Sequence, residues 1–322
     1  MSPNMSMVDR ADLAHIFDMK IVDKPGIYLG ADMDFSKKKD DLFSGIFSKF
    51  QKKLAGWKTA LLTFAGRVTL IKHALLAISL YLLSVFKAPS YFFKRVQSLV
   101  TKFLWKPSTQ KGICWKKWAD LCKPMGLGGL GFRDLKAMNQ SLLAKTAWCI
   151  YKQPQSLLSQ VLLGKYCPNQ DFWRCSASAH SSWGWKGIIW GKQLLKDRVK
   201  WKIGDGCQVD MFTEHWIPNY PNPYMAPNSH RVAANLKVCH LFNPITKKWR
   251  EPLLRSLFPS HIVADIQSIH IPAVAQPDSR IWPFTRSGEY SVKTGYFQCS
   301  LGGISSHSCP GFSAWPKFWA LK

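Results

Sequence analysis

The chain has 322 residues, of which 47% are hydrophobic and 13% aromatic, so extensive disorder is excluded. Its 44 Lys and Arg against 19 Asp and Glu give a formal net charge of +25, so an acidic partner is expected. The most apolar run, Ala74 to Phe86, has thirteen residues, whereas a membrane-spanning helix needs about 20. Because the N-terminus also lacks the apolar region of a signal peptide, we expect an intracellular protein, nuclear or cytoplasmic, without a membrane partner.

The first half of the chain is expected to be mainly helical. A short strand at 26–30 ends a polar segment, and from residue 35 onward apolar residues recur at helical spacing. Pro89 and Pro107 each end a helix, because proline disfavours helical geometry in the residue before it. We therefore predict a basic helical domain at 36–166, preceded by a separate segment at 1–35. The predicted helices cover residues 35–57, 63–87, 91–105, 134–151 and 155–165.

The second half is expected to contain short helices and two β hairpins. Apolar residues alternate on both sides of Asp205-Gly206, which predicts a tight hairpin over 199–211. Four prolines between 218 and 227 then indicate a linker. The fold class is therefore mainly α with small antiparallel β hairpins, in which a connection region at 167–230 precedes a C-terminal unit at 231–322. The remaining elements are helices at 186–197, 247–258 and 260–268 and a second hairpin with strands near 282–284 and 290–292.

The basic residues are concentrated in one stretch that contains no acid. From Leu42 to Ala119 there are fourteen Lys or Arg and no Asp or Glu. A solvated helical surface normally mixes both signs, because oppositely charged pairs at i,i+4 stabilise it. We therefore predict contact with a polyanion, and a merely solvated basic surface is the alternative. The fourteen residues are Lys49, Lys52, Lys53, Lys58, Arg67, Lys72, Lys87, Lys94, Arg95, Lys102, Lys106, Lys111, Lys116 and Lys117.

No group of residues meets the requirements of a catalytic or metal site. Residues 126–131 match G-x-G-x-x-G, but Pro124 argues against the central strand that a dinucleotide fold needs before this motif. The three glutamates are isolated from one another, and a zinc site built from Cys299, His307 and Cys309 would lack a fourth ligand. We therefore predict no enzyme activity, no cofactor, no small-molecule substrate and no bound metal.

Cysteine and tryptophan are both abundant and are expected to be mainly structural. The nine cysteines are odd in number and include no C-x-x-C pair, which favours free thiols in a reducing compartment. Most of the fifteen tryptophans fall at apolar positions of the predicted helices and are expected in the core. One or two of those beside Lys116 and Lys117 are candidates for stacking on nucleic-acid bases, and the sequence does not select which.

A series of short motifs extends through nearly the whole chain. They are Tyr28-Leu-Gly30, Lys53-Leu-Ala-Gly-Trp57-Lys58, Ala65-Gly-Arg67-Val-Thr-Leu-Ile-Lys72, Trp115-Lys-Lys-Trp118, Gly128-Gly-Leu-Gly-Phe-Arg-Asp-Leu135, Asn139-x-x-Leu-Leu-Ala-Lys145, Trp201-x-Ile-Gly-x-Gly206, His215-Trp-Ile-Pro218 and Gly288-x-Tyr-Ser-Val-Lys293. In this order they resemble plant LINE-type non-LTR retrotransposon polyproteins, in the region after the reverse-transcriptase active site. One departure is Glu214, where the family usually has Asp, and we interpret it as drift in a structural turn.

The resemblance implies a thumb-like helical region, a connection region and the start of a zinc-binding module near Gly288. The family's catalytic aspartates lie in a Y-A-D-D motif, which this sequence does not contain. The zinc ligands and the ribonuclease H domain expected further downstream are not in it either. The resemblance therefore implies a non-catalytic fragment of a reverse transcriptase.

A reverse-transcriptase thumb holds the backbone of the primer–template, which requires Lys and Arg but no base readout. We therefore predict sequence-independent binding of RNA, DNA or an RNA–DNA duplex. A basic protein-interaction module, a module for anionic membrane surfaces and a decayed element without function are the alternatives. The predicted nucleic-acid contacts are Lys49, Lys52, Lys53, Lys58, Arg67, Lys72, Lys116 and Lys117.

Overall fold

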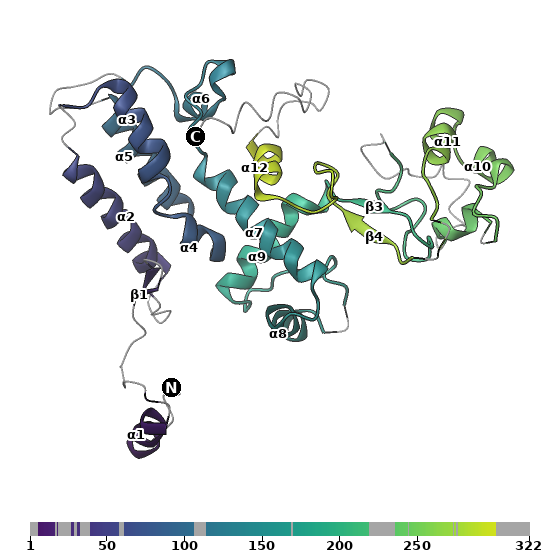
Figure 1. Cartoon of the computed structure of the whole chain (residues 1–322), viewed down its shortest axis with the longest axis horizontal. Helices are drawn as coiled ribbons and strands as arrows, with labels where there is room; N and C mark the ends of the chain where they lie inside the picture. Colours follow the sequence, from purple (N-terminus) through teal and green to yellow (C-terminus); the bar gives the residue numbers. More distant parts are fainter. Residues whose placement is uncertain are drawn as a thin grey trace. The chain divides into compact units, whose positions relative to one another are not determined.

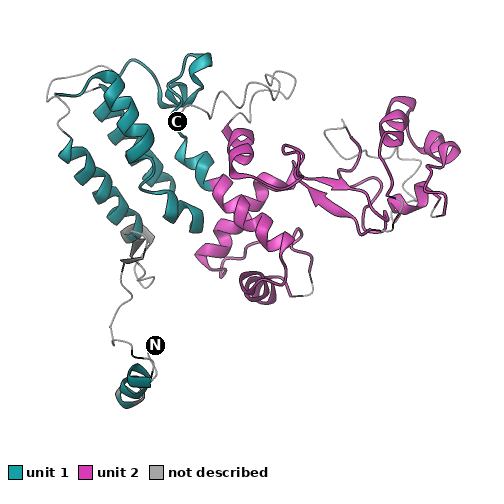
Figure 2. Cartoon of the chain, viewed as in Figure 1, with its two compact units in different colours: residues 1–139 teal, residues 140–322 magenta. Residues whose placement is uncertain are grey.

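The computed structural model describes residues 6–16, 18, 27–28, 31–32, 39–57, 61–105, 114–168, 170–218, 236–243, 245–272, 274 and 276–300. The chain divides into two compact units, Met1–Asn139 and Gln140–Lys322 (Figure 2). Helices dominate, and the strands form two antiparallel pairs, β1 with β2 and β3 with β4. The predicted fold class, mainly α with small antiparallel β elements, is confirmed. The domain limits at 36, 167 and 231 stay predictions.

Unit 1 begins with one short helix and one β pair, and its remaining elements are helical (Figure 1). The strand expected at 26–30 is present as β1. The elements are α1 (Met7–Ile16), β1 (Ile27–Tyr28), β2 (Ala31–Asp32), α2 (Lys39–Gly56), α3 (Phe64–Leu70), the π-helix η2 (Ile71–Leu75), α4 (Leu80–Val85), α5 (Ser90–Trp105), α6 (Trp118–Cys122), the short 3-10 helix η3 (Met125–Leu127) and the start of α7 (Leu135–Lys152).

The core of unit 1 lies between α2, α3 and α5, which contact one another through α5. The Phe43 and Phe92 ring centroids are 4.8 Å apart, and those of Trp57 and Phe103 are 5.4 Å apart. Tilted aromatic pairs at such distances add stabilisation beyond the area that they bury. Aromatic side chains of α2 and α5 thus meet in the core of unit 1.

The helix predicted at 63–87 is not continuous, and this expectation was wrong. It divides into α3, the π-helix η2, a turn and α4. In η2 the Leu76 amide donates to the Ile71 carbonyl, which adds one residue to the turn. The wider turn changes the helical phase of the residues after it, and Ile71, Leu75 and Leu76 are all fully buried. The side chain of Asn139 then accepts from the Ala88 amide and donates to the carbonyls that end α4.

Unit 2 holds the remaining elements, and all five helices predicted there begin and end within four residues of the expected positions (Figure 1). The elements are the rest of α7, α8 (Leu157–Tyr166), α9 (Trp183–Lys196), β3 (Lys200–Lys202), the 3-10 helix η5 (Val238–Leu241), α10 (Glu251–Leu257), α11 (Ser260–Gln267), β4 (Ser279–Ile281) and α12 (Val292–Ser300). Two hydrophobic clusters stabilise this unit: Trp148, Trp185 and Trp282 belong to one and Trp216 to the other.

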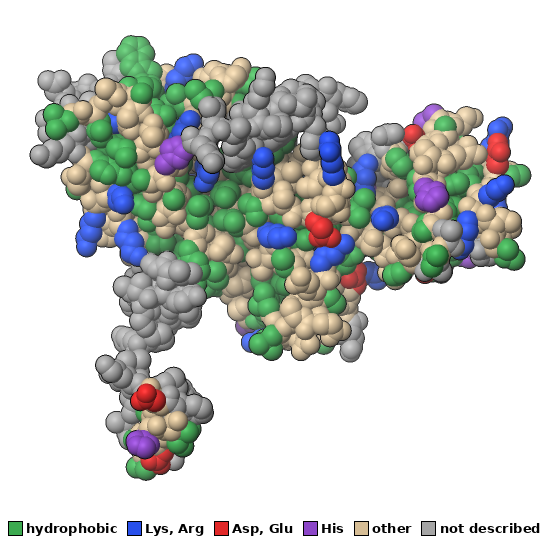
Figure 3. All heavy atoms as spheres, in the orientation of Figure 1, with side chains coloured by type: hydrophobic (Ala, Val, Ile, Leu, Met, Phe, Trp, Pro, Cys, Tyr) green, Lys and Arg blue, Asp and Glu red, His purple; other side chains and the backbone are tan. Residues whose placement is uncertain are grey.

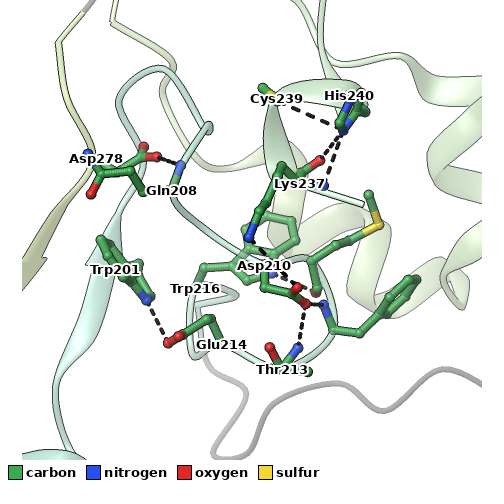
Figure 4. Close-up of polar contacts among 12 residues, drawn as sticks. Trp201, Gln208, Asp210, Thr213, Glu214, Trp216, Lys237, Cys239, His240 and Asp278 are labelled. Carbon is green, nitrogen blue, oxygen red and sulfur yellow. Dashed lines mark hydrogen bonds and ion pairs between the residues drawn. The ribbon is translucent and has the colours of Figure 1, made fainter. Parts of the chain in front are cut away.

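The hairpin predicted over 199–211 is wrong in its pairing. Strand β3 forms as expected, but it pairs with β4, with Trp201 opposite Arg280. The reason is Asp278, whose carboxylate accepts the amides of Gly204, Gly206 and Gln208. Figure 4 shows the bond to Gln208. These bonds hold the chain after β3 in a wide loop, so residues 207–211 cannot fold back on β3.

The second predicted hairpin, with strands near 282–284 and 290–292, was also wrong. A turn does reverse the chain, because Gly288 has φ +72° and its carbonyl accepts the Trp282 amide at 2.7 Å. However, the Ser291 hydroxyl accepts the Thr294 amide, as in a helix N-cap, and α12 begins at Val292. The predicted linker between Pro218 and residue 230 lies outside the described residues.

Two of the nine cysteines form a disulfide, so the expectation of free thiols throughout was wrong. Cys167 ends α8 and is bonded to Cys175, with a Cα–Cα distance of 5.8 Å, in the usual range for a bridge. The buried Lys192 ammonium donates to the carbonyls of Phe172, Trp173 and Cys175, and burial lowers its pKa to about 8. The turn after α8 is thus held by both the bridge and Lys192.

Removing this bridge is expected to lower the free energy of unfolding by roughly 2–3 kcal/mol, because a closed loop of this size restricts the unfolded chain. Urea unfolding of the Cys167→Ala/Cys175→Ala double variant measures the change. Cys207→Ala, at an exposed free cysteine, is the control and should change little. Equal midpoints for wild type and double variant, with nine titratable thiols in the denatured wild type, would contradict the bridge.

Candidate nucleic-acid interface

Helix α2 presents three of the predicted lysines to solvent. Its apolar side buries Leu42, Phe43 and Phe50, among others, and Lys49, Lys52 and Lys53 are exposed. Residues 49, 52 and 53 are spaced three and four apart, so their side chains share one side of the helix. This spacing gives a compact row of positive charge of the kind that binds successive phosphates.

Helix α3 carries Arg67, and the protein supplies no hydrogen-bond partner for two of its guanidinium nitrogens. Thr63 caps the helix by accepting the Gly66 amide at 3.2 Å, and Arg67 lies one turn further on. Its Nε and Nη1 atoms are buried and have no hydrogen-bond partner, and its guanidinium carbon lies 6.0 Å from the centroid of the Phe64 ring. Because these two donors are buried, an external phosphate does not reach them in this structure, and the predicted contact at Arg67 stays a prediction.

Lys72 reaches the glycine turn that precedes α7. A Cβ atom placed on Gly131 would lie 3.7 Å from the Lys72 ammonium nitrogen. Partial burial lowers the pKa of Lys72. The turn is fixed on α6, because Gly131 donates to the Lys123 carbonyl and Leu130 donates to the Leu121 carbonyl. Lys72 therefore lies near the C-terminal end of α6, although α6 begins more than forty residues later in the sequence.

Lys116 and Lys117 lie at the start of α6, and both are exposed. Asp120 forms an ion pair with Lys123 at 2.8 Å. The hydrogen bond and charge of Lys123 lower the pKa of Asp120, and the charges of Lys116 and Lys117 lower it further. One carboxylate thus lies among three ammonium groups, so the net charge around α6 stays positive.

The predicted contacts lie at different places in unit 1. Lys49, Lys52 and Lys53 form the row on α2, and Lys116 and Lys117 lie at the start of α6. Lys72 lies beside the glycine turn at Gly131. Lys58 lies outside the described residues. On the face drawn in Figure 3, Lys and Arg side chains are spread over both units, and acidic side chains lie on α1 of unit 1 and on unit 2.

Three further exposed lysines lie outside the eight predicted contacts, although two of them belong to the acid-free stretch. Lys94 and Lys102 on α5 are exposed, and their spacing of eight residues puts them on one side of that helix. Lys123 follows Asp120 and so lay beyond the acid-free stretch. By contrast, Arg95 lies 4.1 Å over the Phe47 ring and has a structural role. The helical phase of α5 is enough to predict that Lys94 and Lys102 are exposed. The exposure of Lys123 becomes clear only from the fold.

The structure tests the other kinds of site as well. Over the described residues, no group of three or more His, Cys, Asp or Glu could hold a metal ion. The residues before the G-x-G-x-x-G match form α6, and a Cβ on Gly129 would overlap the Lys123 carbonyl. Gly129 therefore serves close packing of the turn on α6, whereas a Cβ on Gly126 or Gly128 would meet nothing within 4 Å. No helix in the described part of the chain has the length and apolarity to cross a membrane.

Comparison with known proteins gives two similar sequences and no matching protein-family model. The Arabidopsis thaliana protein named "Putative ribonuclease H protein At1g65750" is 26% identical over 278 residues, which are 84% of this chain and 45% of that protein. The uncharacterized mitochondrial protein AtMg00310 of Arabidopsis thaliana is 38% identical over 144 residues, which are 44% of this chain and 94% of that protein. The chain thus spans less than half the length of the first relative.

Proposed function

The chain belongs to the family of the uncharacterized mitochondrial protein AtMg00310 of Arabidopsis thaliana, and we propose that it is a retroelement-derived protein that binds the backbone of nucleic acid. The observation that carries this proposal is the exposed lysine row of α2, in a stretch of 78 residues, from 42 to 119, with fourteen basic residues and no acid. The motifs resembling a reverse-transcriptase thumb support it, as does the ribonuclease H name of the longer relative.

The proposed binding does not depend on sequence. Lysine ammonium groups on a helix surface contact phosphates but carry no pattern that distinguishes base edges. Because the sequence contains no Y-A-D-D motif, we propose a holding role without polymerase chemistry.

The test is the salt dependence of binding to a blunt RNA–DNA duplex, followed by fluorescence anisotropy. The logarithm of affinity should fall linearly with the logarithm of salt concentration, with a slope of about −0.9 per phosphate contacted. The Lys49→Gln/Lys52→Gln/Lys53→Gln triple variant should make the slope shallower by up to about 2.7, because three contacts are lost.

A matched control separates the site from the net charge. Lys196→Gln/Lys202→Gln/Lys248→Gln removes the same charge from exposed positions of unit 2 and should leave the slope nearly unchanged. Equal slopes for the two triple variants would refute the α2 site, and a wild-type slope near zero would refute backbone binding altogether. If the protein floats with phosphatidylserine vesicles and added duplex does not compete, the result would favour the membrane-surface alternative.

A further inference from the structure

One tryptophan differs from the others in its surroundings. Trp115 is 73% exposed, and among the tryptophans of the described residues it alone is a largely exposed side chain. Its neighbour Trp118 is half-buried and stacks on Phe132, with ring centroids 5.7 Å apart. The indole of Trp115 therefore offers a flat apolar face to the solvent.

The backbone that carries Trp115 is fixed to the protein. Two residues later the Lys117 carbonyl accepts the amides of Asp120 and Leu121 at 3.0 and 3.1 Å, which starts α6. Leu121 is buried, and its own carbonyl accepts the amides of Leu130 and Phe132. The exposed ring therefore lies two residues before a helix start that is held by these bonds.

The charges around Trp115 define the ligand. Lys116 and Lys117 follow it directly and are exposed, and Lys123 lies on the other side of Asp120. An aromatic face beside a cluster of ammonium groups is the arrangement that binds a base and its neighbouring phosphates together. Within a duplex the base faces are covered by their neighbours, so an exposed ring can stack only on an unpaired or terminal base.

We propose that Trp115 stacks on an unpaired base next to a duplex, while Lys116 and Lys117 contact the adjoining phosphates. This inference rests on the proposed function and deepens it, because it names the junction between duplex and single strand as the preferred ligand. A protein partner that covers Trp115 together with the exposed Met125 and Leu127 is the alternative. That alternative predicts no effect of Trp115 on nucleic-acid affinity.

The experiment compares two probes on the full chain: a blunt RNA–DNA duplex and the same duplex with a single-stranded extension that carries 2-aminopurine at its first unpaired position. Wild type should bind the extended probe more tightly and quench the 2-aminopurine fluorescence by stacking. Trp115→Ala should weaken binding of the extended probe by roughly 5- to 100-fold and abolish the quenching. Trp115→Phe should retain most of both. Binding of the blunt duplex by Trp115→Ala should change much less, because that probe uncovers only its terminal base pairs.

Leu157→Ala on α8 is the matched control, because Leu157 is 78% exposed and should affect neither probe. If wild type binds the blunt duplex but Trp115→Ala has wild-type affinity and quenching on the extended probe, stacking is refuted and the proposed function stands. If Trp115→Ala weakens both probes equally, stacking on an unpaired base is likewise refuted. If wild type binds neither probe, the proposed function itself fails.

Discussion

Replacement of Asp278 by alanine should lower the free energy of unfolding of unit 2 by about 3–5 kcal/mol. The buried carboxylate accepts the amides of Gly204 at 2.7 Å and of Gly206 and Gln208 at 2.9 Å. Its removal leaves three backbone donors unpaired, two of them in buried residues. Water cannot easily replace the carboxylate, because a Cβ on Gly204 would already overlap the Gln276 carbonyl. Urea unfolding followed by tryptophan fluorescence measures the loss.

Asp278→Asn is the graded control for this prediction. An amide oxygen still accepts two of the three bonds, so the loss should be about 1–2 kcal/mol. Hydrogen exchange gives a local readout, because the amides of Gly204, Gly206 and Gln208 should lose protection in the alanine variant before the rest of unit 2 does. Alanine and asparagine variants of equal stability would show that the three bonds contribute little.

The same carboxylate explains why the loop after β3 could not be predicted. Alternation over 199–203 correctly predicts a strand, and Gly206 has the positive φ, +70°, that the predicted turn requires. The error concerns the strand that pairs with β3. That strand is β4, more than seventy positions later, and the loop is held by Asp278 just before it. Local periodicity reports which residues alternate, but it holds no information about a buried carboxylate far along the chain.

The candidate interface was predictable to a similar extent. Composition and the absence of acids correctly identify exposed lysines on α2, because their phase opposes the apolar side. The sequence could not place Lys72 beside the turn at Gly131, since that proximity arises when the glycine turn folds onto α6. It could not select Trp115 over Trp118 either. Both flank the same lysines, and only burial distinguishes the exposed ring from the one stacked on Phe132.

A second large effect is expected at the crossing of α7 and α9, where Gly191 lets the two helix backbones meet (Figure 1). A Cβ atom on Gly191 would lie 2.5 Å from the Ala144 amide nitrogen and 2.7 Å from the Leu143 carbonyl oxygen. Both atoms are backbone, so no side-chain rotation relieves the overlap. The helices must separate, and the cluster around Trp148 and Trp185 must loosen with them.

Gly191→Ala should therefore lower the free energy of unfolding by about 3 kcal/mol, even though alanine favours a helix over glycine by about 1 kcal/mol. Gly184→Ala in the same helix supplies the comparison, because its Cβ would meet nothing within 4 Å. At position 184 only the higher helix propensity of alanine acts, so the free energy of unfolding should rise by up to about 1 kcal/mol. The same substitution, seven residues apart on α9, should thus shift the urea midpoint in opposite directions. A Gly191→Ala variant at least as stable as wild type would mean that α7 and α9 do not cross at backbone contact, and the core of unit 2 would then need a different packing.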